Sequence, residues 1–356
     1  MKYQFSVTKT KVPKNKPNPD TLGFGEVFTD HMFLMDYNES EGWHNGRVVP
    51  YAPLELDPAA LVLHYGQEMF EGLKAYKNPE GKVVLFRPEK NAEKTNNTNK
   101  RMCMPEIDPE LYVEAIKAVV AIDQEWIPEK EGTALYIRPF IIATEPCLSV
   151  RPSKEFLFAV ILSPVGPYYK EGMAPTKIYV EQNFIRSVKG GTGFAKIGGN
   201  YVASLKAQME AKALGYSQVL WLDGVEHKYV DEVGAMNVFF VVGDEVITPS
   251  LDEGSILPGV TRDSCLALLK KWGIKATERR ITIDELSEAY DKGELKEVFG
   301  TGTAAVISPV GELNYNGKVM TINDGKIGTI SQKLYDVMTG IQWGKLPDDM
   351  GWIERV

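Results

Sequence analysis

The segment from Pro164 to Gly172 divides this sequence more sharply than any other stretch. It holds two prolines and two glycines in nine residues, the composition of a connection between domains. The length points the same way, because 356 residues is long for a single hydrophobic core. We therefore predict a small domain over residues 1–165, an interdomain loop over 166–176 and a larger domain over 177–356.

The order of helical and strand-like patterns predicts the fold class. Strand-like runs rich in Val, Ile, Phe and Thr dominate, among them 24–35, 132–142 and 157–162. Helical periodicity or capping signals occur over residues 88–101, 109–126, 201–214, 259–272 and 329–343, and from Thr282 onward. Because these helices do not alternate regularly with the strands, the pattern favours an α+β fold over a doubly wound parallel sheet.

Charge, apolar runs and histidine spacing exclude several classes of function. The net charge of −8 and the isoelectric point near 5.3 argue against a general nucleic-acid-binding protein. No apolar run is long enough for a transmembrane helix, and the N-terminus lacks the apolar core of a signal peptide. The four histidines lack zinc-site spacing, so no metal is expected, and the three separated cysteines fit a reduced, cytoplasmic setting.

A glycine-rich loop surrounds Lys196. Five glycines lie within residues 190–199, and glycine weakens regular elements, so this backbone must turn tightly or approach something closely. A lysine in such a loop is either a solvated charge or a nucleophile in a cavity, where a desolvated amine can form a Schiff base. The loop alone leaves both interpretations open.

Two further segments could bind an anion. Residues 257–262 open a helix, whose first amides suit a phosphate, and the turn at 300–303 could form a nest of amides. Taken singly, the first can be an ordinary helix start and the second an ordinary turn. Lys196 does not fit a P-loop, and the GxGxxA pattern at 300–305 precedes a β-like run where a dinucleotide site needs a helix.

Three side chains suggest what these segments could hold. Tyr136 and Arg138 stand two apart on a predicted strand and so share one face. Glu232 lies in an acidic step before the strand-like 238–242; such a carboxylate is usually solvated, but beside a cationic ring nitrogen it would keep that nitrogen protonated. A lysine, a carboxylate, two phosphate cradles and an arginine are the parts needed to hold pyridoxal phosphate and an amino acid.

At this point the sequence resembles a known family, the branched-chain amino acid aminotransferases, which are class IV (fold type IV) pyridoxal-phosphate enzymes. The resemblance runs from about Phe24 to Trp343 and implies a two-domain α+β fold like that of D-amino acid aminotransferase, with a small N-terminal α/β domain and a larger β-rich C-terminal domain. The matching segments are 24–32, 64–72, 135–139, 193–201, 232–237, 257–260 and 298–303.

The resemblance assigns cofactor roles. Lys196 would form the Schiff base with the cofactor and later move a proton, Glu232 would pair with the ring nitrogen, and Tyr201 would bind the phenolic oxygen. The phosphate would be held by Arg186, Val260, Thr261 and Thr303. Many family members carry arginine as a further phosphate ligand where this chain has Lys94, which keeps the charge but loses the bidentate fork.

The resemblance also implies a substrate pocket. Its apolar wall would consist of Phe24, Tyr65, Phe70, Tyr136, Val150 and Tyr168. The last two would come from a flexible interdomain loop or from a partner subunit, so a homodimer or larger assembly is expected. The turn with Ala304 and Ala305 would receive the substrate carboxylate, and Arg138 with Tyr136 would also receive the side-chain carboxylate of glutamate.

The expected reaction is exchange of the amino group of L-leucine, L-isoleucine or L-valine with 2-oxoglutarate. The alternatives are a D-amino acid aminotransferase, an aminodeoxychorismate lyase, and a phosphate-ligand binder without chemistry. Two family features are missing here. Ala235 replaces a threonine near the substrate, and Ala305 and Ser308 replace the redox cysteine pair of some animal members.

Overall fold

The computed structural model describes residues 3–168 and 173–356, so the centre of the predicted interdomain loop at 166–176 lies outside the described residues. The chain forms two compact units. The first consists of residues 1–170, 195–198 and 340–356, and the second of 171–194 and 199–339. The short segment around Lys196 and the C-terminal residues therefore belong with the N-terminal part of the chain, which linker composition alone did not indicate.

The first unit is built on a sheet of nine described strands in the order β1-β3-β2-β8-β7-β5-β6-β18, with β4 paired to β7. Every pairing is antiparallel except that of β1 with β3. The strands are β1 (Ser6–Val7), β2 (His31–Asn38), β3 (Gly42–Pro50), β4 (Glu68–Phe70), β5 (Leu73–Lys77), β6 (Val83–Phe86), β7 (Ala134–Ala143), β8 (Glu155–Val165) and β18 (Ile353–Arg355).

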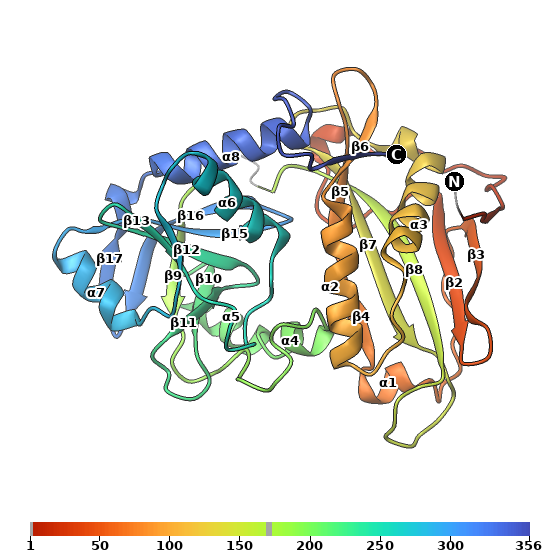
Figure 1. Cartoon of the computed structure of the whole chain (residues 1–356), viewed down its shortest axis with the longest axis horizontal. Helices are drawn as coiled ribbons and strands as arrows, with labels where there is room; N and C mark the ends of the chain where they lie inside the picture. Colours follow the sequence, from red (N-terminus) through yellow and green to blue (C-terminus); the bar gives the residue numbers. More distant parts are fainter. Residues whose placement is uncertain (1–2, 169–172) are drawn as a thin grey trace. The chain divides into compact units, whose positions relative to one another are not determined.

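Two helices cover one face of this sheet (Figure 1): α2 (Pro88–Arg101) and α3 (Pro109–Ile122). Asp108 caps α3 by accepting from the amides of its first turn, and the apolar face of α3 enters the core of the unit. The predicted helices at 88–101 and 109–126 are thus confirmed, the second ending four residues early. The remaining elements are α1 (Leu61–Tyr65), η1 (Pro19–Thr21) and η2 (Gln124–Trp126).

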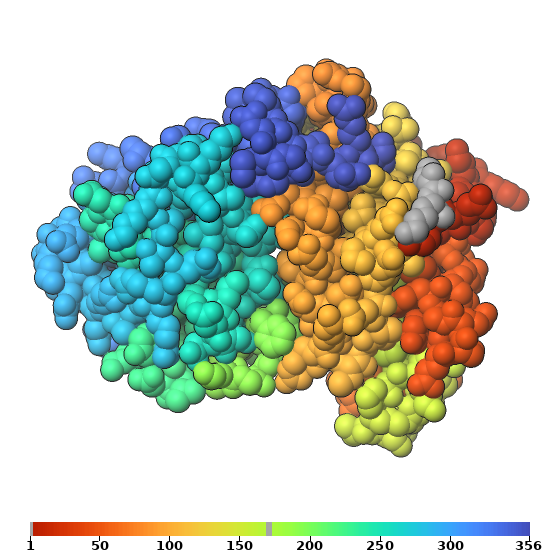
Figure 2. All heavy atoms as spheres, viewed as in Figure 1, coloured from red at the N-terminus to blue at the C-terminus, as the bar shows by residue number. Residues whose placement is uncertain are grey.

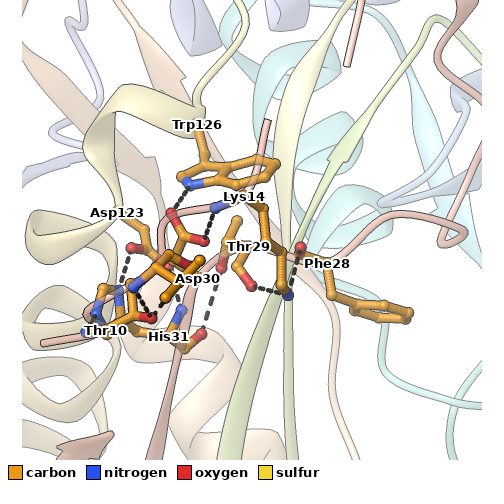
Figure 3. A network of polar contacts seen from close by, with 9 residues as sticks. Thr10, Lys14, Phe28, Thr29, Asp30, His31, Asp123 and Trp126 are labelled. Carbon is orange, nitrogen blue, oxygen red and sulfur yellow. Dashed lines mark hydrogen bonds and ion pairs between the residues drawn. The ribbon is translucent and has the colours of Figure 1, made fainter. Parts of the chain in front are cut away.

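A polar network, buried at His31 and Asp123, fastens Thr10 and Lys14 near the N-terminus to the rest of the first unit (Figure 3). The carboxylate of Asp123 binds both the main-chain amide of His31, at 2.9 Å, and its Nδ1, at 2.6 Å. The other ring nitrogen of His31 accepts from the amide of Thr10 at 2.9 Å. Asp30 accepts from the indole of Trp126 at 3.0 Å and from the amide of Lys14 at 2.9 Å. These contacts hold Thr10 and Lys14, which lie outside the helices and strands, against the rest of the first unit.

The second unit contains another sheet of nine described strands, in the order β11-β10-β9-β16-β15-β12-β13-β14, with β17 on β16. It is mixed, because β9 runs parallel to β10 and β16, and β13 runs parallel to β14. The strands are β9 (Thr176–Val180), β10 (Gln218–Leu222), β11 (Val230–Val233), β12 (Asn237–Val242), β13 (Glu245–Thr248), β14 (Ala276–Glu278), β15 (Leu295–Gly302), β16 (Val306–Tyr315) and β17 (Lys318–Thr321).

Helices of the second unit follow the predictions in part. They are α4 (Gly198–Val202), α5 (Leu205–Ala213), α6 (Val260–Lys271), α7 (Ile283–Asp291), α8 (Thr329–Gln342) and the short η3 (Ile322–Gly325). The hydroxyl of Thr282 caps α7 by accepting from the amide of Glu285 at 3.0 Å, as its capping motif predicted. None of the described helices is long and apolar enough to cross a membrane.

The predicted helix at 201–214 is wrong in one respect. It is interrupted between α4 and α5, and the apolar side chains whose spacing suggested it are exposed: Val202 by 65%, Leu205 by 53% and Met209 by 71%. The small side chains Ala207 and Ala211 are buried against the sheet instead. The strand predicted from residue 24 is also shorter, since β2 begins only at His31, and β3 was not predicted.

Candidate active site

The segment carrying Lys196 is held against β4 in the first unit. The amide of Phe70 donates to the carbonyl of Lys196 at 3.1 Å, and the amide of Lys196 donates to the hydroxyl of Thr98 at 3.0 Å. Ala195 and Ile197, on either side of the lysine, are buried in the hydrophobic core. The main chain of Lys196 is thus fixed, and its Nζ lies 4.8 Å from the centre of the Phe70 ring.

The same ring of Phe70 also contacts Arg138, whose guanidinium carbon lies 4.9 Å from its centre. Arg138 donates to the hydroxyl of Tyr136 at 3.1 Å, and the ring of Tyr136 lies 4.9 Å from that of Phe24. The structure therefore brings together five of the residues predicted from the sequence: one amine, one guanidinium and three aromatic rings. Such a cluster can bind a carboxylate beside an apolar side chain.

Two residues next to this cluster had no predicted role. A methyl group on Gly72 would lie 2.0 Å from the hydroxyl oxygen of Tyr136, so only glycine leaves room for that hydroxyl. Lys74 on β5 is the direct cross-strand neighbour of Tyr136 on β7. Burial lowers the pKa of Lys74 to about 8. Both residues lie within or just after the segment 64–72 that matches the family.

Lys94 is paired with a buried carboxylate. Its Nζ lies 3.0 Å from Oε1 of Glu71, a fully buried residue. The other oxygen of Glu71 accepts from the side-chain amide of Asn91 at 2.9 Å and from the main-chain amide of Gly72 at 3.1 Å. The ammonium predicted as a phosphate ligand is therefore also an ion-pair partner inside the protein. Glu71 lies in the matched segment 64–72 but had no predicted role.

In the second unit, Glu232 on β11 is surrounded by donors. Its Oε2 lies 3.3 Å from Nε of Arg186, and its Oε1 accepts from the amide of Leu257 at 2.9 Å. Asn237 donates to the same Oε1 at 3.4 Å and to the carbonyl of Leu257 at 2.8 Å. Arg186, predicted as a phosphate ligand, is thus in an ion pair with Glu232. The carboxylate is buried and charge-compensated, unlike a solvated one at a strand end.

The two predicted anion cradles also lie in the second unit. Helix α6 begins after Gly259, and no side chain of the described residues caps it, so the first-turn amides at Val260 and Thr261 are left to another acceptor. Thr303, Ala304 and Ala305 form the tight turn between β15 and β16. A strand, β16, follows this turn, as predicted, whereas a dinucleotide-binding GxGxxA motif would be followed by a helix. Tyr201 lies on α4.

Three predicted pocket residues lie on the surface and take no part in the Phe70 cluster. Tyr65 is 44% exposed, and its hydroxyl donates to the carbonyl of Leu148. Val150 is 83% exposed, in the segment between β7 and β8 that projects from its unit (yellow-green in Figure 2). Tyr168, the last described residue before the gap, is also exposed.

Comparison with known proteins assigns the family. The model of the amino-transferase class IV family matches residues 68–313. Branched-chain-amino-acid aminotransferase 2 of Bacillus subtilis (strain 168) is 57% identical over 355 residues, covering 100% of this chain and 98% of the relative. The relative from Mycolicibacterium smegmatis is 48% identical over 339 residues, covering 94% and 92%.

A solved structure agrees. The branched-chain amino acid aminotransferase from T.th., complexed with N-(5'-phosphopyridoxyl)-L-glutamate, superposes with a TM-score of 0.73 at 28% identity, covering 94% of this chain and 98% of that one. The predicted two-domain α+β fold of fold type IV is confirmed by this likeness. The chain belongs to the class IV aminotransferases, among the branched-chain-amino-acid aminotransferases.

Proposed function

We propose that this protein is a pyridoxal-phosphate-dependent transaminase that exchanges the amino group of L-leucine, L-isoleucine or L-valine with 2-oxoglutarate, giving the branched-chain 2-oxo acid and L-glutamate. The observation that carries this proposal is the Phe70 ring with Lys196 and Arg138 both against it. The reaction must accept both an apolar amino acid and a dicarboxylate. The amine would serve the cofactor aldehyde, the apolar ring the apolar side chain, and the guanidinium the second carboxylate. Membership of the branched-chain aminotransferases supports the same reaction.

The residues present fit pyridoxal phosphate. The uncapped start of α6 offers amides that suit a phosphate, and Lys196 supplies the amine that an aldehyde requires. Buried Glu232 is matched to a ring nitrogen that must stay protonated. When bound, the cofactor would supply an electron sink for the bond changes at the amino acid's Cα.

The family resemblance supports the following residue roles. Lys196 would hold the cofactor and carry a proton to and from the substrate's Cα, and Tyr201 would donate to the cofactor's phenolic oxygen. The phosphate would be bound by the amides of Val260 and Thr261, by Thr303, and by the cations Arg186 and Lys94. The contact of Arg186 with Glu232 gives this arginine a second task, which is to stabilise the carboxylate's charge.

On the substrate side, Phe24, Phe70 and Tyr136 would enclose the apolar side chain and keep water from it. The turn at Ala304 and Ala305 would receive the α-carboxylate through its amides. This turn ends at Val306, whose φ of 63° is unusual for a β-branched residue, and such backbone strain is concentrated at functional sites. Arg138, steadied by Tyr136, would receive the second carboxylate of glutamate or 2-oxoglutarate.

We further propose a homodimer or larger assembly that works in the cytoplasm. The exposed side chains of Leu63, Tyr65, Leu148 and Val150, together with the exposed stripe of Val202, Leu205 and Met209, would be covered by a second copy of the chain. Tyr65 and Val150 would thereby complete the partner's substrate pocket. Close bacterial relatives and an acidic chain with unpaired cysteines support the cytoplasmic setting.

Steady-state kinetics with a panel of amino donors and 2-oxoglutarate tests this function. We expect turnover of L-leucine, L-isoleucine and L-valine, and little with D-alanine or aminodeoxychorismate. Fast turnover of D-alanine without L-leucine activity would assign the chain to a different class IV reaction. A colourless protein that takes up no pyridoxal phosphate would indicate a binder without chemistry.

A further inference from the structure

Helix α2 buries a polar face. Asn91, Thr95 and Thr98 are spaced four and three residues apart, which places them on one side of the helix, and each is at most 2% exposed. A helix packed on a sheet ordinarily turns an apolar face inward, and buried polar groups need partners. The partners of this face are Glu71, through Asn91, and the lysine segment, through Thr98.

The contact of Thr98 is with the main chain of Lys196 itself. Its hydroxyl oxygen accepts the amide proton of Lys196 at 3.0 Å, while the carbonyl of Lys196 accepts from the amide of Phe70 at 3.1 Å. Both main-chain groups of the lysine are therefore occupied, one by helix α2 and one by strand β4. With Ala195 and Ile197 anchored in the core, the side chain of Lys196 leaves the backbone from a fixed point.

We propose that Thr98 is a positioning residue for Lys196: its hydroxyl fixes the lysine main chain so that Nζ is presented in one place, beside the Phe70 ring. This inference rests on the proposed function, in which Lys196 reacts with the cofactor aldehyde. In this role Thr98 would act only through its contact with the main chain of Lys196.

Loss of the Thr98 hydroxyl should affect the reaction of Lys196 with the cofactor aldehyde but not the binding of the cofactor's phosphate and ring. Without the hydroxyl, a buried amide loses its acceptor, and the segment must shift to find another. A shifted Lys196 meets the aldehyde less often in a reactive geometry. Binding of the cofactor's phosphate and ring does not use the lysine, so it should stay unchanged.

Two probes separate these effects. Pyridoxal 5′-phosphate carries the aldehyde, whereas pyridoxine 5′-phosphate has the same ring and phosphate with a hydroxymethyl group that cannot react with an amine. The experiment measures, on the apo form of the full chain, the rate at which the visible absorption of bound pyridoxal phosphate develops and the Kd of pyridoxine phosphate. The variants are Thr98→Val, which is isosteric, and Thr98→Ser, which keeps the hydroxyl.

Thr95 provides the matched control. It is fully buried on the same helix, and its hydroxyl lies near the hydroxyl of Tyr112 and not near the lysine segment. Thr95→Val therefore removes an equivalent buried hydroxyl without touching the lysine segment. Should Thr98→Val fail to fold, Thr98→Ala is measured in its place.

We expect Thr98→Val to slow covalent attachment on the order of ten-fold, the scale of one unsatisfied buried amide, with the Kd of pyridoxine phosphate changed by less than about two-fold. Thr98→Ser and Thr95→Val should behave as the unchanged protein does. The inference would be overturned if Thr98→Val attached pyridoxal phosphate at the normal rate, or if it lost affinity for pyridoxine phosphate to the same extent as it lost attachment rate. It would also be overturned if Thr98→Ser attached pyridoxal phosphate as slowly as Thr98→Val. Failure of the unchanged protein to attach pyridoxal phosphate would instead refute the proposed function.

Discussion

Arg186 and Glu232 form a buried ion pair in the second unit, with Nε 3.3 Å from Oε2. The other carboxylate oxygen accepts from the amide of Leu257. A neighbouring cation and an amide donor both favour the charged form of a carboxylate. If Glu232 pairs with the cofactor's ring nitrogen as proposed, these contacts would keep its carboxylate charged for that role.

Replacing Glu232 by glutamine keeps the shape and removes the charge. We expect Glu232→Gln to bind pyridoxal phosphate but to lose roughly 100-fold or more in kcat, because the ring is no longer kept protonated. Cofactor content by absorbance and single-turnover rates with L-leucine measure the two effects separately. Glu226→Gln serves as the control, since Glu226 is an exposed carboxylate with no proposed role. Unchanged turnover in Glu232→Gln would remove Glu232 from the mechanism.

Asp231 predicts a pH-dependent stability. Burial raises its pKa from 3.8 to about 6; Arg186 opposes the shift and Glu232 adds to it. The folded protein thus binds this proton more tightly than the unfolded chain, so the residue's contribution to the free energy of unfolding falls as pH rises from about 4 to about 6. Asp231→Asn should raise the free energy of unfolding by up to about 3 kcal/mol above about pH 6, and by little below about pH 4.

Urea unfolding of the unchanged protein and of Asp231→Asn at about pH 4 and about pH 8 measures this difference, since the other titrating groups are common to both proteins. We expect the gain in stability at the higher pH to exceed that at the lower. A gain that is the same at both pH values would show that Asp231 does not titrate in this range.

Arg138 should distinguish the two substrates. If it receives the second carboxylate of the dicarboxylate substrate, Arg138→Met should lower kcat/KM for 2-oxoglutarate by roughly 100-fold. The kcat/KM of the L-leucine half-reaction should fall less, because leucine lacks that second carboxylate. Separate half-reaction kinetics measure the ratio. Equal losses for both substrates would assign Arg138 to the α-carboxylate alone.

Gly72 should affect recognition of the second carboxylate indirectly, because it leaves room for the Tyr136 hydroxyl that contacts Arg138. Gly72→Ala places a methyl carbon 2.0 Å from the hydroxyl oxygen of Tyr136, so the Tyr136 side chain must move and release Arg138. We expect kcat/KM for 2-oxoglutarate to fall about ten-fold in Gly72→Ala. Tyr136→Phe, which removes the hydroxyl directly, should cause a similar loss. The double variant should be no worse than either single one. Additive losses would show that Gly72 acts elsewhere.

Lys94 should matter for both stability and phosphate binding. Lys94→Met leaves the buried carboxylate of Glu71 without its cation, which costs about 3 kcal/mol, the lower end of the usual range, since Asn91 and Gly72 still donate to it. If the ammonium also contacts the phosphate, pyridoxal phosphate and pyridoxine phosphate should both bind more weakly, and Lys94→Arg should restore both. A stability loss with unchanged binding of both probes would leave Lys94 as a partner of Glu71 only.

Local signals in the sequence predicted several elements well. Helical periodicity over residues 109–126 predicted α3, and the capping motif at Thr282 predicted the start of α7. Tyr136 and Arg138 share a face because a strand alternates. These features depend on neighbours in sequence, which is why they can be read without a structure.

Other features depend on contacts distant in sequence. The stripe of Val202, Leu205 and Met209 has core-like spacing yet is exposed, because the sheet accepts only the small Ala207 and Ala211 there. The pairing of Lys94 with Glu71 and that of Thr98 with Lys196 join positions 23 and 98 residues apart. Polar residues at helical spacing on the predicted helix at 88–101 were the available signal for both, but only the tertiary structure shows their partners.

The central claim is that Lys196 is the residue that holds pyridoxal phosphate. Borohydride reduction of the cofactor-loaded protein, followed by peptide mass mapping, tests it directly. We expect a single phosphopyridoxyl group on the peptide containing Lys196, and none in Lys196→Ala, which should also be inactive. A label on another lysine, or transamination at the normal rate by Lys196→Ala, would contradict the account.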